Sequence, residues 1–358
     1  MGRRGFVDEV PFTFRKDIIV VKARLNHDTT LREFIFDTGA FNSKVEQGLA
    51  ERLGMPTVAT KTNSTAQGIS KEIAVGRLDS LTLGSTPFYK ISAGKVAYAE
   101  GSASPCLAPH GLIGANLIQL AHWRIDYPNR LLAFSDEPFA PLPELPTIRI
   151  PFSTPVLSGT PKIDLQLQGR TVENVLFDVG YNGGLVLPME LAGHFEGKVL
   201  HHLADRSTSG IYGSNTDTLL VKKLRLQLGK GTEGWEVPVE FSSIGKVLLG
   251  NALLRHFTVL LDYQANEIVL QQQGPIHHEP LHAFVPGILN DSLWVVDRVP
   301  VGQQVLQLGD TLTAINGQRP GGLFNGFCDY FFGVRPLLEG DTLRLQRPDG
   351  SSLKLTRN

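Results

Sequence analysis

The sequence has few cysteines, no long apolar run and no excess of charge of either sign, and each shortage excludes a class of protein. No apolar stretch approaches the roughly 18 residues that a bilayer-spanning helix needs, so no transmembrane segment is expected. Lys and Arg number 34 and Asp and Glu 35, which gives a formal net charge of −1. Because the chain has no basic field, it is not expected to bind nucleic acid or an anionic membrane.

The two cysteines, Cys106 and Cys328, are too few and too far apart for a metal motif or a disulfide framework. Two buried free thiols are expected, and the alternative is a disulfide that would join different domains. The histidines show no ligand spacing, although His277, His278 and His282 lie together in one linker. Neither a metal ion nor another cofactor is therefore expected.

The first six residues lack the apolar core of a leader peptide and the Ser or Thr that N-myristoylation requires at the sixth position. The protein is expected to be cytoplasmic, or exported to a compartment such as the periplasm if a leader has been removed. The sequence leaves these two locations open.

Glycine and proline are abundant and evenly spread, with 37 and 22 residues. Together with many short β-branched runs, they predict frequent turns and a mostly β fold. The length of 358 residues predicts two or three domains. A proline-rich segment at 135–146 and a Gln- and His-containing segment at 271–281 are typical of linkers. The predicted domains span residues 10–140, 147–273 and 281–358.

The first two predicted domains repeat one order of elements. In each, an apolar run leads into an acid at a glycine turn, as Asp37-Thr38-Gly39 and as Asp178-Val179-Gly180. An apolar pair before glycine follows in each, as Leu112-Ile113-Gly114 and as Leu248-Leu249-Gly250. The acids are 141 residues apart (178 − 37) and the leucines 136 (248 − 112). These similar offsets predict a duplicated β unit of roughly 120–130 residues.

Packing of the two copies about a pseudo-two-fold axis would bring Asp37 and Asp178 together. Carboxyl groups within ~3 Å of one another cannot both ionise, so the pair shares one proton. The ionised member can accept a proton from a water molecule, and the protonated member can donate one to a scissile carbonyl. The sequence contains no Gly-x-Ser-x-Gly, His-Glu-x-x-His or Gly-x-x-x-x-Gly-Lys motif that would indicate a different chemistry.

The repeated Asp loops and the apolar-apolar-Gly runs resemble the retropepsin-like aspartic peptidases in a single-chain, two-lobed form. The resemblance extends over residues 15–270. It implies two acid-protease β lobes related by a pseudo-two-fold axis, and an aspartic endopeptidase acting on extended peptide or unfolded protein. The implied catalytic residues are Asp37 and Asp178. The residues implied to support this pair are Thr38, Gly39, Val179 and Gly180.

In that family a β-hairpin flap closes over the bound peptide. The resemblance places flap tips at Gln67-Gly68 and at Gly210-Ile211-Tyr212-Gly213. The implied substrate-binding residues are Gln67, Gly68, Ile211 and Tyr212.

Val179 departs from the family pattern, which has Thr or Ser at this position. Valine keeps the shape of threonine but loses its hydroxyl group and the hydrogen bonds that it makes across the interface. The alternative function is therefore a catalytically inactive peptide-binding or scaffolding protein with a degenerate second loop.

Residues 281–358 resemble a PDZ domain of bacterial type, chiefly through the run from Leu308 to Gly317. PDZ domains bind an extended peptide as an added strand, often by its C-terminal carboxylate. The resemblance implies Gly287, Ile288 and Leu289 as peptide-binding residues. A C-terminal peptide is the partner implied for this domain, which would assist peptide binding by the peptidase.

Overall fold

The computed structural model describes residues 5–156, 158–230, 234–290, 292–303 and 305–356. Strands predominate, so the predicted mostly β fold is confirmed. The helices are short: α1 (Gln47–Arg52), α2 (Ser104–Leu107), α3 (Ala115–Ile118), α4 (Asn251–Leu254), α5 (Phe327–Gly333) and the 3-10 helices η1 (Met189–His194) and η2 (Arg335–Leu338). In the described part of the chain, none of them has the length and hydropathy of a membrane-spanning helix.

Two similar hairpins pair with one another in the largest sheet. They are β10 (His122–Asp126) with β11 (Leu131–Ser135), and β22 (Phe257–Asp262) with β23 (Glu267–Gln272). Strands β10 and β22 pair antiparallel, with Trp123 opposite Leu261 and Ile125 opposite Val259. Strand β10 ends at Asp126 and β22 at Asp262. Counted back from these two acids, Ile125 has the same position as Leu261, and Trp123 has the same position as Val259. The register is therefore symmetric about a pseudo-two-fold axis. Strands β1 (Val7–Pro11) and β12 (Thr147–Ser153) flank the two hairpins.

The remaining strands of the two halves follow one another in the same spatial order. The first repeat, residues 18–135, orders its strands as β3 (Ile18–Leu25), β4 (Arg32–Phe36), β9 (Gly111–Ile113), β5 (Ser43–Glu46), β8 (Thr86–Val96), β7 (Ser70–Leu83) and β6 (Thr57–Ser64), with β2 (Thr13–Arg15) beside β3. The second repeat, residues 162–272, orders its strands as β13 (Lys162–Leu167), β14 (Arg170–Phe177), β21 (Leu248–Leu249), β15 (Leu185–Pro188), β20 (Trp235–Ser242), β19 (Asp217–Gln227) and β16 (Lys198–Asp205). The parallel pairs match as well, β4–β9 with β14–β21 and β5–β8 with β15–β20. The predicted duplication is confirmed at the level of strand order.

One hydrophobic core extends through both repeats. Its aromatic centre in the first repeat is Trp123, whose ring centroid lies 4.9 Å from that of Phe36 and 5.0 Å from that of Phe134. Phe36 and Phe177 are fully buried and are the last residues of β4 and β14. Anchoring these phenylalanines in the core fixes where each strand ends, and the acid that follows each strand is placed accordingly.

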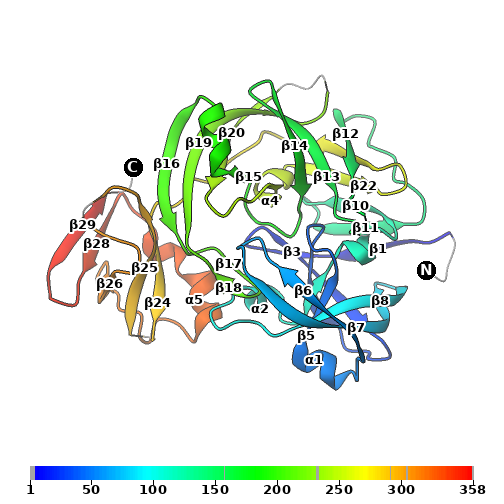
Figure 1. The fold of residues 1–358 in the computed structure, drawn as a ribbon, viewed down its shortest axis with the longest axis horizontal. Coiled ribbons are helices and arrows are strands. Elements are labelled where there is room, and N and C mark those ends of the chain that lie inside the picture. Colours follow the sequence, from blue (N-terminus) through cyan, green and yellow to red (C-terminus); the bar gives the residue numbers. More distant parts are fainter. Residues whose placement is uncertain (1–4, 157, 231–233, 291, 304, 357–358) are drawn as a thin grey trace.

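The C-terminal segment, residues 285–356, lies along the outer edge of the second repeat (Figure 1). Its strands are β24 (Val285–Leu289), β25 (Leu293–Pro300), β26 (Thr311–Leu312), β27 (Ala314–Ile315), β28 (Thr342–Gln346) and β29 (Ser352–Thr356). Strand β25 pairs antiparallel with β16, with Asp205 opposite Arg298, so the sheet of the second repeat continues into this segment. A separate hydrophobic cluster forms around the buried Trp294.

Cys106 and Cys328 form a disulfide that joins α2 of the first repeat to α5 of the C-terminal segment. The expectation of two free thiols is wrong. The cysteines are 222 residues apart in sequence, but their Cα atoms are only 5.1 Å apart because the C-terminal segment folds back beside the first repeat. The segment is thus attached to the first repeat covalently and to the second by strand pairing.

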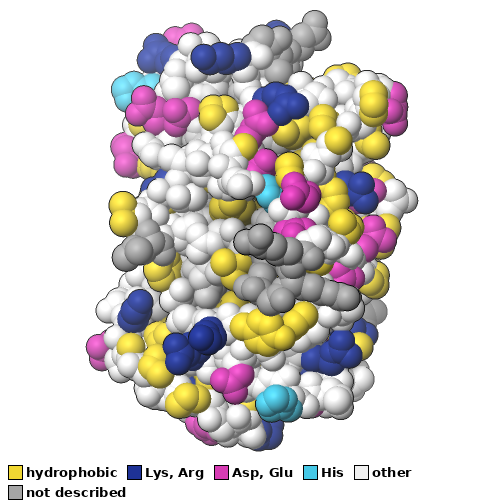
Figure 2. Space-filling model, turned by 90° about the vertical axis from the view of Figure 1, so that its right-hand side faces the viewer, with side chains coloured by type: hydrophobic (Ala, Val, Ile, Leu, Met, Phe, Trp, Pro, Cys, Tyr) yellow, Lys and Arg dark blue, Asp and Glu magenta, His cyan; other side chains and the backbone are white. Residues whose placement is uncertain are grey.

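Charges of both signs are interspersed on the face drawn in Figure 2, which is the right-hand side of Figure 1. This pattern agrees with the formal net charge of −1. Hydrophobic side chains lie among the charged ones on the same face.

Candidate active site

The two acids of the Asp loops occupy matching backbone positions. The N–H of Asp37 donates to the carbonyl of Ile113 at 3.0 Å, and the N–H of Asp178 donates to the carbonyl of Leu249 at 2.9 Å. The acceptors lie on β9 and β21, the short buried strands that cross beside the Asp loops. Each acid is therefore held at the end of its strand by the apolar-apolar-Gly run that the sequence repeats.

Each loop glycine lies directly against the acid of the opposite loop. A Cβ atom on Gly39 would lie 2.5 Å from Cγ of Asp178, and one on Gly180 would lie 2.3 Å from Cγ of Asp37. Non-bonded carbon atoms do not approach this closely, so only glycine fits at either position. Each carboxyl group also influences the pKa of the other. The structure thus brings Asp37 and Asp178 together across the interface between the repeats.

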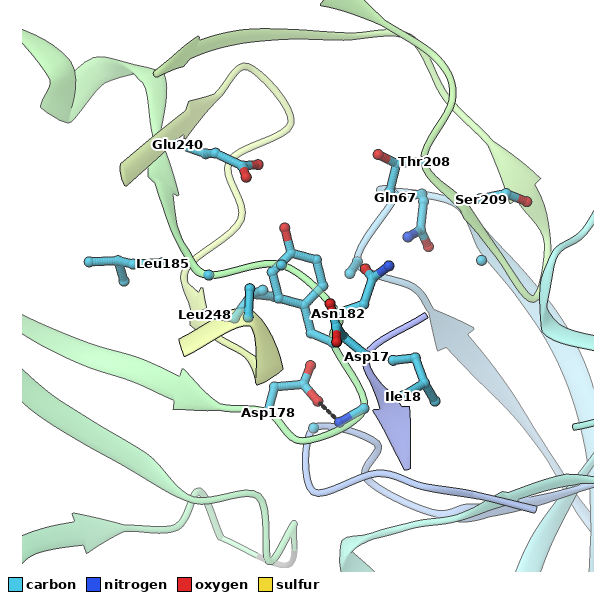
Figure 3. Close-up of a pocket in the computed structure, with 18 of the residues that line it drawn as sticks. Asp17, Ile18, Gln67, Asp178, Asn182, Leu185, Thr208, Ser209, Glu240 and Leu248 are labelled. Carbon is cyan, nitrogen blue, oxygen red and sulfur yellow. Dashed lines mark hydrogen bonds between the residues drawn. The ribbon is translucent and has the colours of Figure 1, made fainter. Parts of the chain in front are cut away.

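Backbone amides hold both carboxyl groups in place. The N–H of Ala40 donates to Oδ1 of Asp37 at 2.8 Å. The N–H of Gly180 donates to Oδ1 of Asp178, also at 2.8 Å, as the dashed line in Figure 3 shows. These amides orient the carboxyl groups and favour their ionised forms.

The two carboxyl groups differ in proton affinity. Burial raises the pKa of Asp37, and the charge of the nearby Lys44 and the loop amides offset part of this rise. Burial, with the neighbouring Asp37 carboxylate, raises the pKa of Asp178 well above its usual value. Because the groups are in contact, they titrate as a pair, and between the two steps the pair carries one proton and one negative charge.

A single hydroxyl group connects the two loops. Oγ1 of Thr38 donates to the carbonyl of Phe177 at 2.7 Å and accepts from the N–H of Val179 at 3.0 Å. Val179 occupies the matching position of the second loop, is fully buried and packs in the apolar core. The second loop therefore has no hydroxyl with which to return this pair of hydrogen bonds. The hydroxyl of the first loop thus bonds to the backbone of the second, and the side chain of Val179 makes no matching bonds to the backbone of the first.

Two hairpins meet above the acids. The first has β6 and β7 as its arms and Gln67-Gly68 at its turn. The second has β16 and β19 as its arms and carries the short pair β17 (Ser209–Gly210) and β18 (Gly213–Ser214) at its end. A Cβ on Gly210 would lie 2.1 Å from Oε1 of Gln67, so the two tips touch. The tips predicted from the sequence coincide with turns of these hairpins.

The tip of the second hairpin is also bonded to the first repeat. The N–H of Ala99 donates to the carbonyl of Ile211 at 3.1 Å, and Oγ of Ser102 donates to the carbonyl of Gly210 at 2.8 Å. Nδ2 of Asn63 donates to the hydroxyl of Tyr212 at 2.9 Å. The second hairpin therefore closes across the interface onto the opposite repeat.

The acids and the hairpins enclose a cavity of about 1160 Å³. Figure 3 shows Asp178 at the base of this cavity, with Gln67, Thr208 and Ser209 together on its opposite side. Of the predicted substrate-binding residues, Gln67 and Ile211 line the cavity. Gly68 instead lies against Ile244, and Tyr212 is buried with 6% of its surface exposed. The cavity is long enough to extend from the acids to the linker at 278–282.

The residues predicted to bind a peptide in the C-terminal segment lie apart from the acids. Gly287, Ile288 and Leu289 belong to β24, which ends its sheet beyond β25. None of the three is part of the cavity lining in the described structure. Other residues of this segment do reach the cavity, namely Val285 of β24, Arg298 of β25 and Phe331 of α5.

Several charged residues of the cavity were not found by sequence reasoning, among them Lys44 and Arg298. Lys44 lines it on the Asp37 side, and Arg298 enters it from the C-terminal segment. Arg298 forms a two-point ion pair with the buried Asp205, at 2.9 and 3.1 Å. The available signal for Lys44 was its position inside the short strand Ser43–Glu46, where Ser43 and Val45 on either side are buried. Nothing in the linear sequence marks Arg298.

The residues that the structure describes contain no group of three or more His, Cys, Asp or Glu side chains arranged to hold a metal ion.

Comparison with known proteins gives two findings. Residues 21–117 match the family model described as aspartyl protease, a range that contains Asp37 and ends before the second repeat. Among solved structures, the chain is similar to the crystal structure of an aspartic proteinase from Irpex lacteus, with a TM-score of 0.46 and 13% sequence identity over 75% of this chain and 97% of that chain. No curated protein matches the chain.

Proposed function

We propose that this protein is an aspartic endopeptidase in which Asp37 and Asp178 form the catalytic pair. The observation that carries the proposal is the reciprocal contact of each loop glycine with the opposite acid. This contact, repeated in both directions, holds two carboxyl groups against one another at the base of a large cavity. A pair of buried acids that shares one proton is suited to the hydrolysis of an amide by a water molecule.

The reaction divides the two steps of proton transfer between the acids. The ionised carboxyl accepts a proton from a water molecule held between the pair, and the resulting hydroxide forms a bond to the scissile carbonyl carbon. The protonated carboxyl donates its proton to the carbonyl oxygen, which gives a tetrahedral gem-diol. The carboxyl that accepted the proton of the water molecule then donates it to the amide nitrogen as the C–N bond breaks, and the other carboxyl recovers a proton from a hydroxyl of the gem-diol as the product carboxyl group forms. None of these steps requires a metal ion or a nucleophilic side chain.

An extended peptide or an unfolded protein is the substrate we propose. The cavity runs between the hairpin tips and the acids, and Gln67 and Ile211 line it from the two hairpins. The two tips touch above it, so a folded protein does not fit between them and the acids.

We further propose that residues 10–140 and 147–273 act as the two peptidase lobes and residues 281–358 as a PDZ-like domain. Strand β24 supports the latter role because it ends its sheet, as a strand that accepts an added peptide must. Gly287, Ile288 and Leu289 on this strand are the proposed contacts for a C-terminal peptide.

Replacing either acid by its amide tests the function. Asp37→Asn and Asp178→Asn are expected to abolish cleavage of an unfolded protein at acidic pH, because an amide cannot exchange the proton that the pair shares. The measurement is peptide release together with thermal unfolding, which should show that both variants remain folded. Asp126→Asn is the matched control, because the carboxylate of Asp126 accepts its hydrogen bonds from the turn residue Asn129 and lies outside the cavity lining.

Full activity of the Asp37→Asn variant would disprove the proposal. A statine-type peptide separates the enzyme from the inactive peptide-binding protein that Val179 suggests. Inhibition of measured turnover supports the enzyme. Tight binding without turnover of any member of a broad peptide library supports the binding protein.

A further inference from the structure

Lys44 is a buried cation on the Asp37 side of the cavity. Only 6% of its surface is exposed, and its Nζ donates to the carbonyl of Asn42 at 3.3 Å. It shares the cavity lining with Asp37, to which it is electrostatically coupled. Burial disfavours the charged form of a lysine, so a lysine kept in this position needs a compensating negative charge. Burial lowers the pKa of Lys44, and the negative charge of Asp37 offsets part of this lowering.

The second repeat has no cation at the matching position. Lys44 lies opposite Leu112 of β9, and Val186 lies opposite Leu248 of β21, so Val186 is the counterpart of Lys44. On the strand that pairs with each of them, the charged residue is in the second repeat instead. Gly94 of β8 lies opposite Lys44, whereas Glu240 of β20 lies opposite Val186. The first repeat therefore has a lysine beside its acid loop, whereas the second has a valine at the matching position and a glutamate on the neighbouring strand.

The other charges around the pair do not cancel this difference. Asp37 is influenced by Lys44 and by Asp178. Asp178 is influenced by Asp37, and the buried phenol of Tyr181 also lies within range of it.

Glu240 is occupied with a second group of charges. Burial raises the pKa of Glu240; Arg298 and Lys246 offset part of this rise, while Asp205 and Asp217 add to it. The residues paired with Lys44 on β8 and β9 are Gly94 and Leu112, and neither carries a charge. The positive charge of Lys44 therefore acts chiefly on one acid of the pair, Asp37.

We propose that Lys44 is a positioning residue that places the negative charge of the pair on Asp37 and leaves the shared proton on Asp178. This inference rests on the proposed function and deepens it by assigning the two roles. Asp37 is then the base that accepts the proton of the water molecule, and Asp178 is the acid that donates to the carbonyl oxygen of the substrate. Lys44 itself exchanges no proton in the reaction.

The pH dependence of catalysis tests the role of Lys44. A nearby positive charge makes the first ionisation of the pair easier, so its removal makes that ionisation harder. In Lys44→Met, the acidic limb of the kcat/KM profile is expected to move to higher pH by about one unit. On the acidic side kcat/KM falls by about tenfold, which follows from that shift, while the maximum of the profile and KM change little.

Two variants control for charge and for packing. Lys44→Arg keeps the positive charge and is expected to keep the acidic limb of the unmodified protein. Lys22→Met removes one positive charge from the same repeat at an exposed position of β3 and is expected to leave the profile unchanged. A Lys44→Met variant that is active and has the unmodified acidic limb would overturn the proposal.

A second measurement needs neither a Lys44 variant nor catalytic activity. Carbon-13 NMR of the protein labelled at the aspartate carboxyl groups follows each acid through its titration, with Asp37→Asn and Asp178→Asn used for assignment. Asp37 is expected to ionise first, and ionisation of Asp178 first would overturn the role of Lys44. Absence of turnover in the unmodified protein would disprove the peptidase function alone, because the titration still decides where the proton lies.

Discussion

The first and second repeats have the same strand order, but the side chains around their acid loops differ. Both loops keep the glycine contact and the hydrogen bond from the N–H of the acid to a carbonyl of the crossing strand. Thr38 and Lys44 are found only in the first repeat, where the second has Val179 and Val186. The features that bring the acids together are thus duplicated, whereas those that make the acids unequal occur once. A symmetric scaffold can therefore support an asymmetric division of proton transfer.

The two hairpins above the acids differ in the same way. Strand β6 of the first hairpin is at the end of its sheet and is largely exposed. Strand β16 of the second hairpin pairs with β25 of the C-terminal segment. The second hairpin is thus fixed at its outer strand and at its tip, whereas the outer strand of the first, β6, is a sheet edge and this hairpin contacts the second through Gln67 and Asn63. We expect the first hairpin to be the one that opens more readily.

The largest expected effect comes from adding a methyl group to either loop glycine, because both repeats place this glycine against the opposite acid. In Gly39→Ala or Gly180→Ala, the new Cβ would overlap the opposite carboxyl group, so the pair must separate. A displacement on the order of 1 Å at reacting groups lowers the rate by roughly 100-fold, and each variant is expected to lose at least that much in kcat. The measurement is kcat on an unfolded protein substrate, with thermal unfolding as the check on the fold.

Gly193→Ala is the matched control, because a Cβ on this glycine meets no other atom within 4 Å. Its activity should equal that of the unmodified protein. Equal losses in the two loop variants would show that the glycine contacts are equivalent. Activity retained by either loop variant would contradict the reciprocal contact.

A smaller effect is expected from releasing the second hairpin. Asp205 is only 1% exposed at its side chain, and burial alone would raise its pKa, but Arg298 and the hydrogen bonds from Ser207 hold the pKa below its usual value. Arg298→Met leaves this carboxylate buried without its partner. Loss of one member of a buried ion pair costs about 3 kcal/mol, and the free energy of unfolding is expected to fall by that amount near neutral pH. Urea unfolding measures the change.

The pH dependence of this loss has a definite sign. A carboxyl group whose pKa is lowered by folding contributes stability above its unfolded pKa of about 3.9, and that contribution disappears as the pH falls through the folded value. The difference between Arg298→Met and the unmodified protein should therefore shrink in acid. Arg149→Met is the control, because its ion pair with Glu267 is more exposed and is worth less than about 1 kcal/mol. A loss for Arg298→Met no larger than this would show that the C-terminal segment does not hold the hairpin.

Sequence reasoning found the features that are local and repeated. An acid at a glycine turn after an apolar run is visible twice, and constant offsets between such landmarks predict two similar halves. The disulfide was missed because nothing near Cys106 or Cys328 shows that positions 222 residues apart meet. The pairing of β16 with β25 was missed for the same reason, since the exposed edge of a strand accepts any partner that tertiary packing brings to it. The difference between the repeats at Lys44 became visible only when the strand register identified Val186 as the matching residue.

The smallest expected effect concerns the hydroxyl that only one loop has. Thr38→Val leaves the buried carbonyl of Phe177 and the N–H of Val179 without their partner, which should lower the free energy of unfolding by about 2 kcal/mol. Val179→Thr adds a hydroxyl at the matching position, and a new buried hydrogen bond adds only about 1 kcal/mol. Thermal unfolding of the two single variants and the double variant compares them.

The double variant Thr38→Val, Val179→Thr decides how far the symmetry of the interface extends, because it moves the hydroxyl from the first loop to the second. If the backbone groups of the two loops are equivalent, the moved hydroxyl restores most of the stability that Thr38→Val loses. If the double variant is no more stable than Thr38→Val, the first loop cannot receive a hydroxyl from the second. Val179 would then be fixed by the packing around it, and the asymmetry of the pair would extend to the backbone of the loops as well as to Lys44.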